Sequence, residues 1–384
     1  MRHFVPWALF TPVGEWHFVR NSLTPGTVID ESFYQHHGYL GRETYLNEMT
    51  FPLVGVNIGA GNYVAGPLED WCDGAVRLNG VDQHYAANGN GPYNKSLDIG
   101  TNNFILEAYV RTDPGHVGGV LAAKTAAQGY TLQINNAGHA QFIVRHGGVD
   151  VFTCESGMLV NDGDWHHLLV EYRRPAAQVM IYVDGVPDNG AAVGTPPAAG
   201  VWITNSAAFL VGKGPAGNYF AGEIEFLRVS RGTLADAATT IEELYDWQFG
   251  GPMLADFRSV PPSGRRDAGA LELAYAGEAL PRITRQPTNI VLELGMAGGA
   301  RVAALNGTAY AWSKDAAPYH ASTNTALAFT TTQTGDAGVY VLTVSNSAGA
   351  ATSAPIVVSV IPEPFSMLWL AGCICMARRI GVAT

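Results

Sequence analysis

Short runs that alternate apolar and polar residues, each closed by a turn signal, recur along most of this 384-residue chain. In residues 104–111 the side chains alternate strictly, and successive residues of a strand point to opposite faces of a sheet. Residues 179–183 alternate in the same way and end at Asp184-Gly185, a pair that favours a tight hairpin turn. Residues 130–148 are typical of a strand, a turn and a second strand. The pattern predicts an all-β protein.

The composition agrees with many strands and tight turns. The chain has 45 glycines and only 14% charged residues, whereas long helices need the charged helix formers. One segment, 238–248, shows helical periodicity, because its apolar side chains recur at spacings of three and four. We therefore expect a β-sandwich or jelly roll that is closed by one helix.

Charge and cysteine content argue against a nucleic-acid-binding protein and against a small disulfide-rich scaffold. The formal net charge of −11 and the lack of Lys and Arg clusters argue against nucleic acid as a partner. Four cysteines are too few for a disulfide scaffold. Cys72 and Cys154 lie outside the C-terminal apolar run, and export would make them a candidate disulfide pair, although the sequence does not fix their separation.

Residues 14–250 resemble the laminin-G-like, concanavalin A-like jelly-roll domain of bacterial secreted proteins. The resemblance rests on "VGEWHF", "VIDESFYQHHGYLG", "GAVRLNGVDQHY", "NFILEAYVR", "DGDWHHLLVEYRRPAAQVMIYVDGVP" and "YFAGEIEFLRVSRGTL", in the order of that family. It implies two stacked antiparallel sheets in a fold that often binds carbohydrate. Residues 251–280, rich in Gly, Pro and Arg, are predicted to be a linker.

Residues 281–360 resemble an immunoglobulin-like domain. Trp312 takes the place of the core tryptophan, and Tyr340, in "DAGVYVLTVSNSAG", takes the place of the tyrosine corner. The two cysteine positions of such domains fall at about Ala303 and at Leu342, so the resemblance implies apolar contact instead of a disulfide.

The chain closes with an apolar run between a Pro-Glu-Pro and an Arg-Arg. Residues 365–377 carry no charge, but thirteen residues fall short of the roughly 20 that span a bilayer as a helix. Tilt and bilayer thinning reduce the difference, and the basic pair orients the segment with its end in the cytoplasm. The alternative to a membrane segment is an apolar C-terminal strand or helix that packs on the preceding domain.

Residues 361–380 resemble the PEP-CTERM sorting signal, which combines such a motif, a short membrane helix and a basic cluster. The residues that carry it are Pro362, Glu363, Pro364, Arg378 and Arg379. The resemblance implies processing by a membrane protease-transpeptidase of the exosortase type, and an exported protein that is transiently anchored in the membrane. The N-terminus shows no clear signal peptide, so we expect the true start to lie further upstream.

Two polar pairs invite a catalytic interpretation. His166 and His167 are neighbours on a predicted strand, so they point to opposite faces, and we interpret them as structural. Glu223 and Glu225 are two apart and are expected on one face, as in a glycoside hydrolase. Phe226 stands where the related family usually has a glutamate, so we predict that the protein is not an enzyme.

Calcium and sugar are the expected ligands of the jelly roll. Related jelly rolls often hold a Ca²⁺ ion with carboxylates and backbone oxygens, which makes Asp30, Asp82 and Glu225 the candidate ligands. Sugar binding needs aromatic faces beside amides in a shallow groove. Gly-rich loops offer such residues at Tyr93, Asn94, Tyr130, Asn218 and Tyr219.

The order of the parts predicts a non-catalytic protein of the bacterial cell envelope or extracellular matrix. Its jelly roll would bind polysaccharide or another surface ligand. The alternatives are a glycoside hydrolase or polysaccharide lyase, and a structural adhesin with a protein partner.

Overall fold

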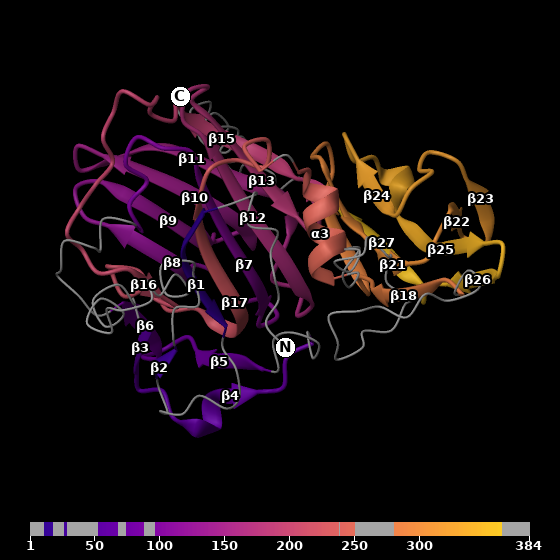
Figure 1. Ribbon diagram of the computed structural model, residues 1–384, viewed down its shortest axis with the longest axis horizontal. Helices are drawn as coiled ribbons and strands as arrows, with labels where there is room; N and C mark the ends of the chain where they lie inside the picture. Colours follow the sequence, from indigo (N-terminus) through magenta and orange to yellow (C-terminus); the bar gives the residue numbers. More distant parts are fainter. Residues whose placement is uncertain are drawn as a thin grey trace, which may run out of the picture.

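The computed structural model describes residues 11–17, 27–28, 53–67, 74–87, 97–237, 239–249 and 280–362. These residues form strands and turns, with one α-helix, α3 (Ile241–Phe249), and two short 3-10 helices, η1 (Ala60–Asn62) and η3 (Thr334–Asp336). The predicted all-β class and the predicted helix are therefore confirmed. The jelly-roll-like sheets make up the larger part of the described chain (Figure 1).

One sheet of the larger sandwich is called the covered sheet here, because other elements pack on its outer face. Its strand order is β14 (Val186–Pro187), β13 (Gln178–Val183), β12 (Trp165–Arg173), β7 (Phe104–Thr112), β17 (Ala221–Arg231), β5 (Ala75–Asn79) and β4 (Tyr63–Val64), and β1 (Thr11–His17) also pairs with β17.

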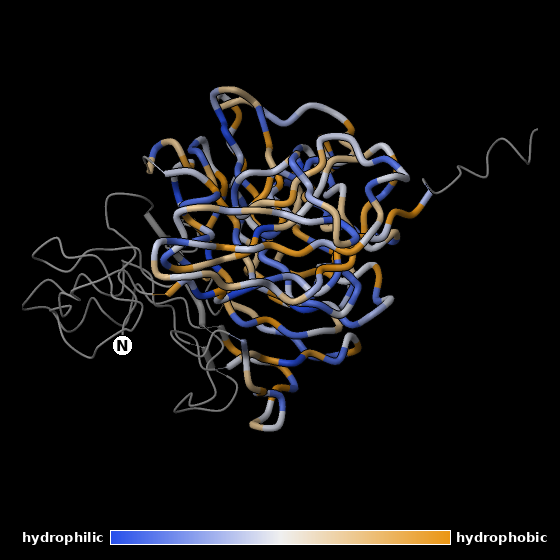
Figure 2. Tube along the Cα trace, turned by 90° about the vertical axis from the view of Figure 1, so that its right-hand side faces the viewer, coloured by the Kyte–Doolittle hydropathy of each residue, from blue (hydrophilic) through white to orange (hydrophobic). Residues whose placement is uncertain are grey.

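The facing sheet is called the open sheet. Its strand order is β2 (Thr27–Val28), β3 (Leu53–Val56), β6 (His84–Ala87), β16 (Leu210–Val211), β8 (Val120–Thr125), β9 (Gly129–Ile134), β10 (His139–His146) and β11 (Val149–Leu159), and β15 (Asn189–Gly194) also pairs with β11. Hydrophobic and hydrophilic residues alternate in short steps along the chain (Figure 2), as period-2 strands require.

A second, smaller sandwich follows. One layer contains β19 (Asn289–Glu293), β27 (Ile356–Ile361), β25 (Gly338–Asn346), β22 (Ala309–Lys314), β23 (Ala317–Tyr319) and β26 (Gly349–Thr352). The other contains β18 (Arg282–Arg285) paired with β21 (Ala303–Leu305), and β20 (Gly298–Arg301) paired with β24 (Ala326–Phe329). A single residue pair, Met158 with Leu292, joins β11 to β19 and so continues the open sheet into this sandwich.

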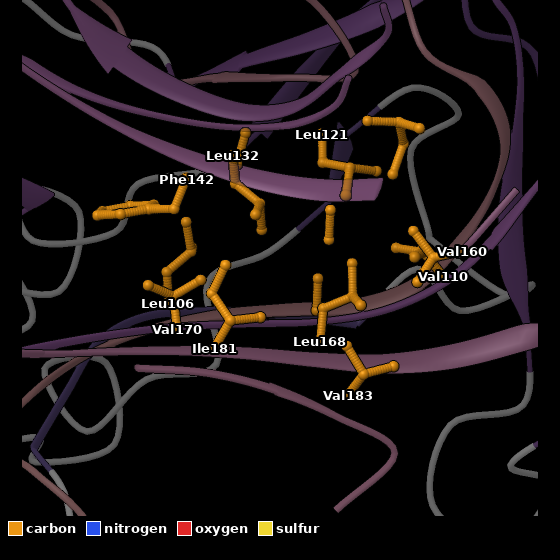
Figure 3. Packing of buried hydrophobic residues seen from close by; sticks show 14 of the residues in the cluster. Leu106, Val110, Leu121, Leu132, Phe142, Val160, Leu168, Val170, Ile181 and Val183 are labelled. Atoms are coloured by element: carbon orange, nitrogen blue, oxygen red, sulfur yellow. The ribbon is translucent and has the colours of Figure 1, made fainter. Parts of the chain in front are cut away.

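The main core lies between the covered and open sheets. Leu106, Leu168 and Ile181 of the covered sheet face Leu132 and Phe142 of the open sheet (Figure 3). The alternation in residues 104–111 places Leu106 in this core, and its neighbours face the other way, as predicted. The hairpin turn predicted after β13 is also confirmed, since Asp184 and Gly185 both have positive φ, at 49° and 76°.

Helix α3 covers part of the outer face of the covered sheet. Its N-terminus is capped reciprocally, because Glu243 N donates to Thr240 Oγ1 at 3.2 Å and Thr240 N donates to Glu243 Oε2 at 3.3 Å. Leu244 packs against Ile105 of β7, while Phe249 contacts Tyr109 of the same strand with ring centroids 4.9 Å apart. Both faces of β7 are therefore buried.

The second sandwich docks on the jelly roll and on α3 (Figure 1). The Arg301 guanidinium donates to the Asp246 carboxylate of α3 at 3.1 and 3.2 Å, and its backbone N donates to Asp184 O at 3.0 Å. The Arg285 guanidinium carbon lies 4.9 Å from the ring centroid of Tyr109. His139 Nε2 lies 3.2 Å from Glu293 Oε1. These contacts make the two sandwiches one packed unit.

Gly157 of β11 tests this docking. A Cβ atom there would lie 1.9 Å from the backbone oxygen of Ala297 in the second sandwich. Gly157→Ala should lower the free energy of unfolding by about 1–3 kcal/mol, because backbone must move, with urea denaturation as the measurement. Gly200→Ala, where nothing lies within 4 Å, is the matched control. Equal stability of the two variants would contradict the docking.

The residues of the predicted C-terminal sorting signal lie largely outside the described residues. Pro362 is described, whereas Glu363, Pro364, Arg378 and Arg379 are not. In the part of the chain that is described, no helix has both the length and the apolar character needed to cross a membrane. The sorting signal and its short helix stay predictions. The predicted linker 251–280 also falls outside, except for Leu280.

Candidate functional site

The two outer faces of the larger sandwich differ in what covers them. On the covered sheet, β7 and β12 are buried on both faces beneath α3 and the second sandwich. On the open sheet, β9 and β10 alternate between buried and half-buried residues. The open sheet therefore presents the outer face that can receive a ligand.

A groove of about 400 Å³ lies on this face, over β8, β9 and β10. Residues 214–218, which connect β16 to β17, form one of its walls. The residues that line it are Val120, Thr125, Ala126, Thr131, Gln133, Ile143, Arg145, Asp150, Gly214, Pro215, Ala216 and Asn218. Hydroxyl, amide and aliphatic groups, with the charged side chains of Arg145 and Asp150, thus surround a shallow space on a sheet surface.

Amide side chains form a hydrogen-bonded row beside the groove. Gln133 and Gln141 are paired across β9 and β10, and Gln133 Nε2 donates to Gln141 Oε1 at 2.8 Å. Gln141 Nε2 donates in turn to Glu155 Oε2 of β11 at 3.4 Å, and Asn135 Nδ2 donates to the same oxygen at 2.6 Å. The register of the sheet places these side chains on one face, and their bonds fix their orientation.

The wall of residues 214–218 is held by its own backbone. Gly214 N donates to Asn218 O at 3.1 Å, Gly217 N donates to Gly214 O at 3.0 Å, and Val120 N of β8 donates to Asn218 O at 3.2 Å. Gly217 has a φ of +88°, which glycine adopts without strain. The amide side chain of Asn218 is therefore presented to the groove from a fixed loop.

The five predicted sugar-binding residues differ in where the structure places them relative to the groove. Asn218 lines the groove, and its role in sugar binding stays a prediction. Tyr219 is half-buried and does not line it; its ring lies 5.1 Å from Lys213 Nζ and 5.9 Å from the His84 ring. Tyr93 and Asn94 lie outside the described residues.

The prediction for Tyr130 is corrected. Its side chain is 1% exposed, its hydroxyl donates to Leu97 O at 2.8 Å, and its ring packs on Phe104 with centroids 4.8 Å apart. The reason is strand parity, because Tyr130 shares its face with Leu132 and Ile134, which fill the core. Its neighbours on the opposite face reach the groove.

The groove residues of β9 and β10 were missed at the sequence level. The same alternation contained the signal: in "YTLQIN" the polar residues Thr131, Gln133 and Asn135 occupy one face. In "AQFIVR" the polar residues Gln141 and Arg145 share one face with Ile143. The polar face of each of these two strands indicates the residues that reach the groove, whereas the aromatic side chain of Tyr130 lies on the opposite face.

Of the candidate calcium ligands, the two described ones lie in different elements. Asp82 lies in the turn between β5 and β6, where Oδ1 accepts from Asn79 Nδ2 at 2.8 Å and Oδ2 from Asn57 Nδ2 at 3.0 Å. Glu225 lies far along β17, beneath Gly66, and Asp30 is outside the described residues. Among the described side chains, no group of three His, Cys, Asp or Glu is placed to hold a metal. Calcium binding stays a prediction.

The two candidate catalytic carboxylates are covered. Glu223 is 4% exposed, and its Oε1 accepts from Arg77 at 3.0 Å and from Arg111 at 2.7 Å. Glu225 is 0% exposed, and a Cβ atom on Gly66 would lie 2.3 Å from its Oε1. A β-bulge at Glu225 also shifts the register of β17 on β7. The arrangement does not offer this pair to a sugar ring.

Cys154 is buried in the main core and forms no disulfide with another described residue; burial raises the pKa of its thiol to about 12. Cys72 lies outside the described residues, so the proposed disulfide stays a prediction.

The adjacent histidines of β12, His166 and His167, have separate partners, which agrees with a structural role. His166 contacts Asp162 and Asp184, whereas His167 Nε2 donates to Glu107 Oε1 at 2.8 Å.

Comparison with known proteins gives one family match, to part of the chain. Residues 82–238 match a family described as the concanavalin A-like lectin/glucanases superfamily. No curated protein matches the chain. A similar solved structure is the CBM40 of the Ruminococcus gnavus IT-sialidase, with 15% identity and a TM-score of 0.35, covering 44% of this chain and 94% of that one.

Two further structures are similar to parts of the chain. A Trypanosoma rangeli sialidase in complex with 2,3-difluorosialic acid has 15% identity and a TM-score of 0.38, with 61% and 32% of the two chains covered. A SAP-like pentraxin from Limulus polyphemus has 12% identity and a TM-score of 0.30, with 40% and 72% covered. The family match, together with the two facing sheets, supports a concanavalin A-like jelly-roll domain in this chain.

Proposed function

We propose that the protein is a non-catalytic, exported component of a bacterial cell envelope or extracellular matrix, and that its jelly roll binds polysaccharide in the groove of the open sheet. The observation that carries this proposal is the lining of the groove. Thr131, Gln133 and Asn218 bring hydroxyl and amide groups to a sheet face that the rest of the described chain leaves uncovered. Such groups both donate to and accept from sugar hydroxyls.

The burial of Glu223 and Glu225 supports the non-catalytic part of the proposal. A glycoside hydrolase needs two carboxyl groups that flank the scissile bond, with space for the sugar between them. Here two guanidinium groups contact one carboxylate, and Gly66 covers the other.

The remaining parts of the proposal concern the second sandwich and the tail. We assign residues 281–360 to an immunoglobulin-like domain. Tyr340 Oη donates to Asp336 O at 2.8 Å, which is the bond of a tyrosine corner, and Leu342 is buried in the same cluster as Trp312. Ala303 belongs instead to the cluster of Tyr109 and Phe249, so the apolar contact expected between Ala303 and Leu342 is corrected: the side chain of Ala303 faces the jelly roll and α3. Residues 361–380 would direct the protein to an exosortase-type enzyme.

Removing two groove amides together should weaken glycan retention. Gln133→Ala with Asn218→Ala should raise the dissociation constant about 10- to 30-fold, because each lost hydrogen bond is worth about 1 kcal/mol. Affinity electrophoresis in gels that contain the host's own exopolysaccharide measures this. Gln178→Ala, an exposed amide on β13 of the covered sheet, is the control and should leave retention unchanged.

Three other outcomes favour other functions. Retention that the double variant and the control share would move the ligand away from the groove. Release of reducing sugar from a retained polysaccharide would favour the hydrolase or lyase. Absence of any glycan retention, with capture of a defined surface protein, would favour an adhesin.

A further inference from the structure

The charges in the groove are already balanced by each other. Among the described residues that line it, Arg145 and Asp150 are the charged ones. Arg145 Nη1 donates to Asp150 Oδ1 at 2.8 Å, and Nη2 donates to Gly148 O. The two residues are partners across β10 and β11, so the register of the sheet holds the pair together. The guanidinium is therefore directed to a protein carboxylate and a carbonyl.

The surroundings add negative charge. Glu155 lies five residues beyond Asp150 on β11, opposite Gln141, and its carboxylate accepts from Asn135 and Gln141. The whole chain carries a formal net charge of −11. This negative potential repels a polymer that carries a carboxylate or sulfate on each sugar. The cation of the groove, Arg145, is already paired with Asp150 and does not offset that repulsion.

The uncharged polar groups suit hydroxyl groups. Thr125, Thr131, Gln133 and Asn218 each contain a donor and an acceptor, whereas binding an anion requires donors and positive charge. Ile143, which is half-buried, provides apolar area for the C–H face of a sugar ring. The lining thus matches a ring that carries hydroxyls and no charge.

We propose that the groove selects neutral glycans and rejects uronic, sialylated and sulfated ones. This inference rests on the proposed function and narrows its ligand to one chemical class. Arg145 and Asp150 act as the selectivity element, because the carboxylate of Asp150 occupies the place that the carboxylate of an acidic sugar would take.

The first experiment compares paired polymers. Affinity electrophoresis of the full chain is run with neutral β-glucan, mannan and galactan, and with alginate, polygalacturonate and a sulfated galactan, at about 20 and about 300 mM NaCl. We expect retention by at least one neutral polymer, nearly independent of salt, and none by the acidic ones. Retention by an acidic polymer that weakens with salt overturns the selectivity while leaving glycan binding intact. No retention by any polymer, the host exopolysaccharide included, removes the proposed function itself.

The second experiment releases the cation. Asp150 is exposed, so Asp150→Asn should fold normally and leave Arg145 free to contact an acidic sugar. The variant should gain about two- to fivefold in affinity for acidic polymers at low salt, the size expected of one exposed ion pair. Asp150→Asn combined with Arg145→Gln should lose that gain. If Asp150→Asn leaves the ratio of neutral to acidic affinity unchanged, the selectivity role of this pair is overturned.

Discussion

Replacing His166 with alanine is expected to lower the free energy of unfolding by about 3–5 kcal/mol, the cost of breaking a buried ion pair. His166 lies on β12 and is almost fully buried. Its Nε2 lies 3.1 Å from Asp162 Oδ1 and its Nδ1 lies 2.9 Å from Asp184 Oδ2. Alanine would leave both carboxylates in the interior without their cation. Asp184 also accepts from His167 N, so the loss would reach the β13–β14 hairpin.

The same contact predicts a dependence on pH. Burial by itself lowers the pKa of His166, but the charge of Asp184 and the hydrogen bonds to both aspartates outweigh it and raise the pKa from 6.5 to about 10. The folded state therefore binds this proton more tightly than the unfolded state. The stabilisation should be complete below about pH 6.5 and should be lost as the pH rises through about 10.

Urea denaturation of the wild type and of His166→Ala at pH 6, 8 and 10 measures both effects. The difference in stability between the two proteins should be largest at pH 6 and smallest at pH 10. His166→Gln keeps hydrogen-bonding capacity without the charge and should lie between them. His320→Ala, at an exposed position, is the control. A His166→Ala protein as stable as this control would show that the contacts of His166 with Asp162 and Asp184 contribute nothing to stability.

Replacing Lys124 with methionine should cost a similar amount, about 3–5 kcal/mol. Lys124 is 0% exposed, and its Nζ donates to Asp98 Oδ1 at 2.6 Å and to Asn205 O at 2.9 Å. Burial lowers the pKa of Lys124 and raises the pKa of Asp98, because each charge loses its water. Methionine matches the length of lysine but leaves Asp98 buried without its cation.

A double-mutant cycle isolates the pair. Lys124→Met combined with Asp98→Leu removes both charges, and it should be far more stable than Lys124→Met alone, since well-packed apolar residues often replace a buried ion pair without loss. Urea midpoints of the four proteins give the coupling. Additive effects of the two substitutions would mean that the charges do not stabilise each other.

Because Asn205 also donates to the backbone of Lys124 and Gln128 at the β8–β9 turn beside the groove, Lys124→Met should weaken glycan retention as well.

The faces of individual strands were predictable. Alternation in residues 104–111 assigned Leu106 to the core because side chains of a strand alternate by geometry alone. What covers the other face was not predictable, since α3 and the second sandwich reach Ile105 and Tyr109 from distant parts of the chain. Glu223 and Glu225 show the same limit. Their spacing of two residues can be seen in the sequence and predicts one shared face. The bulge of β17 arises where it pairs with β7, and the two arginines that contact Glu223 are brought there by the neighbouring strands β5 and β7.

The candidate site followed from the sequence only in part. The Gly-rich loop before β17 is a local signal, and its Asn218 lines the groove. Tyr130 has the parity of the core residues Leu132 and Ile134, which excludes it from the outer face. The pair of Arg145 with Asp150 depends on the register of β10 on β11. No local pattern states that register, because a shift of one residue exchanges every side chain between the faces.

The sequence by itself determined the all-β class, the hairpin at Asp184-Gly185, the position of α3 and the core face of β7, since each depends on steric preferences within a few neighbouring residues. Only the tertiary structure decided which sheet is covered, where the groove lies, and which acids meet His166 and Lys124. Those features join residues far apart in the chain, and their energies come from burial and charge pairing that exist once the sheets have assembled.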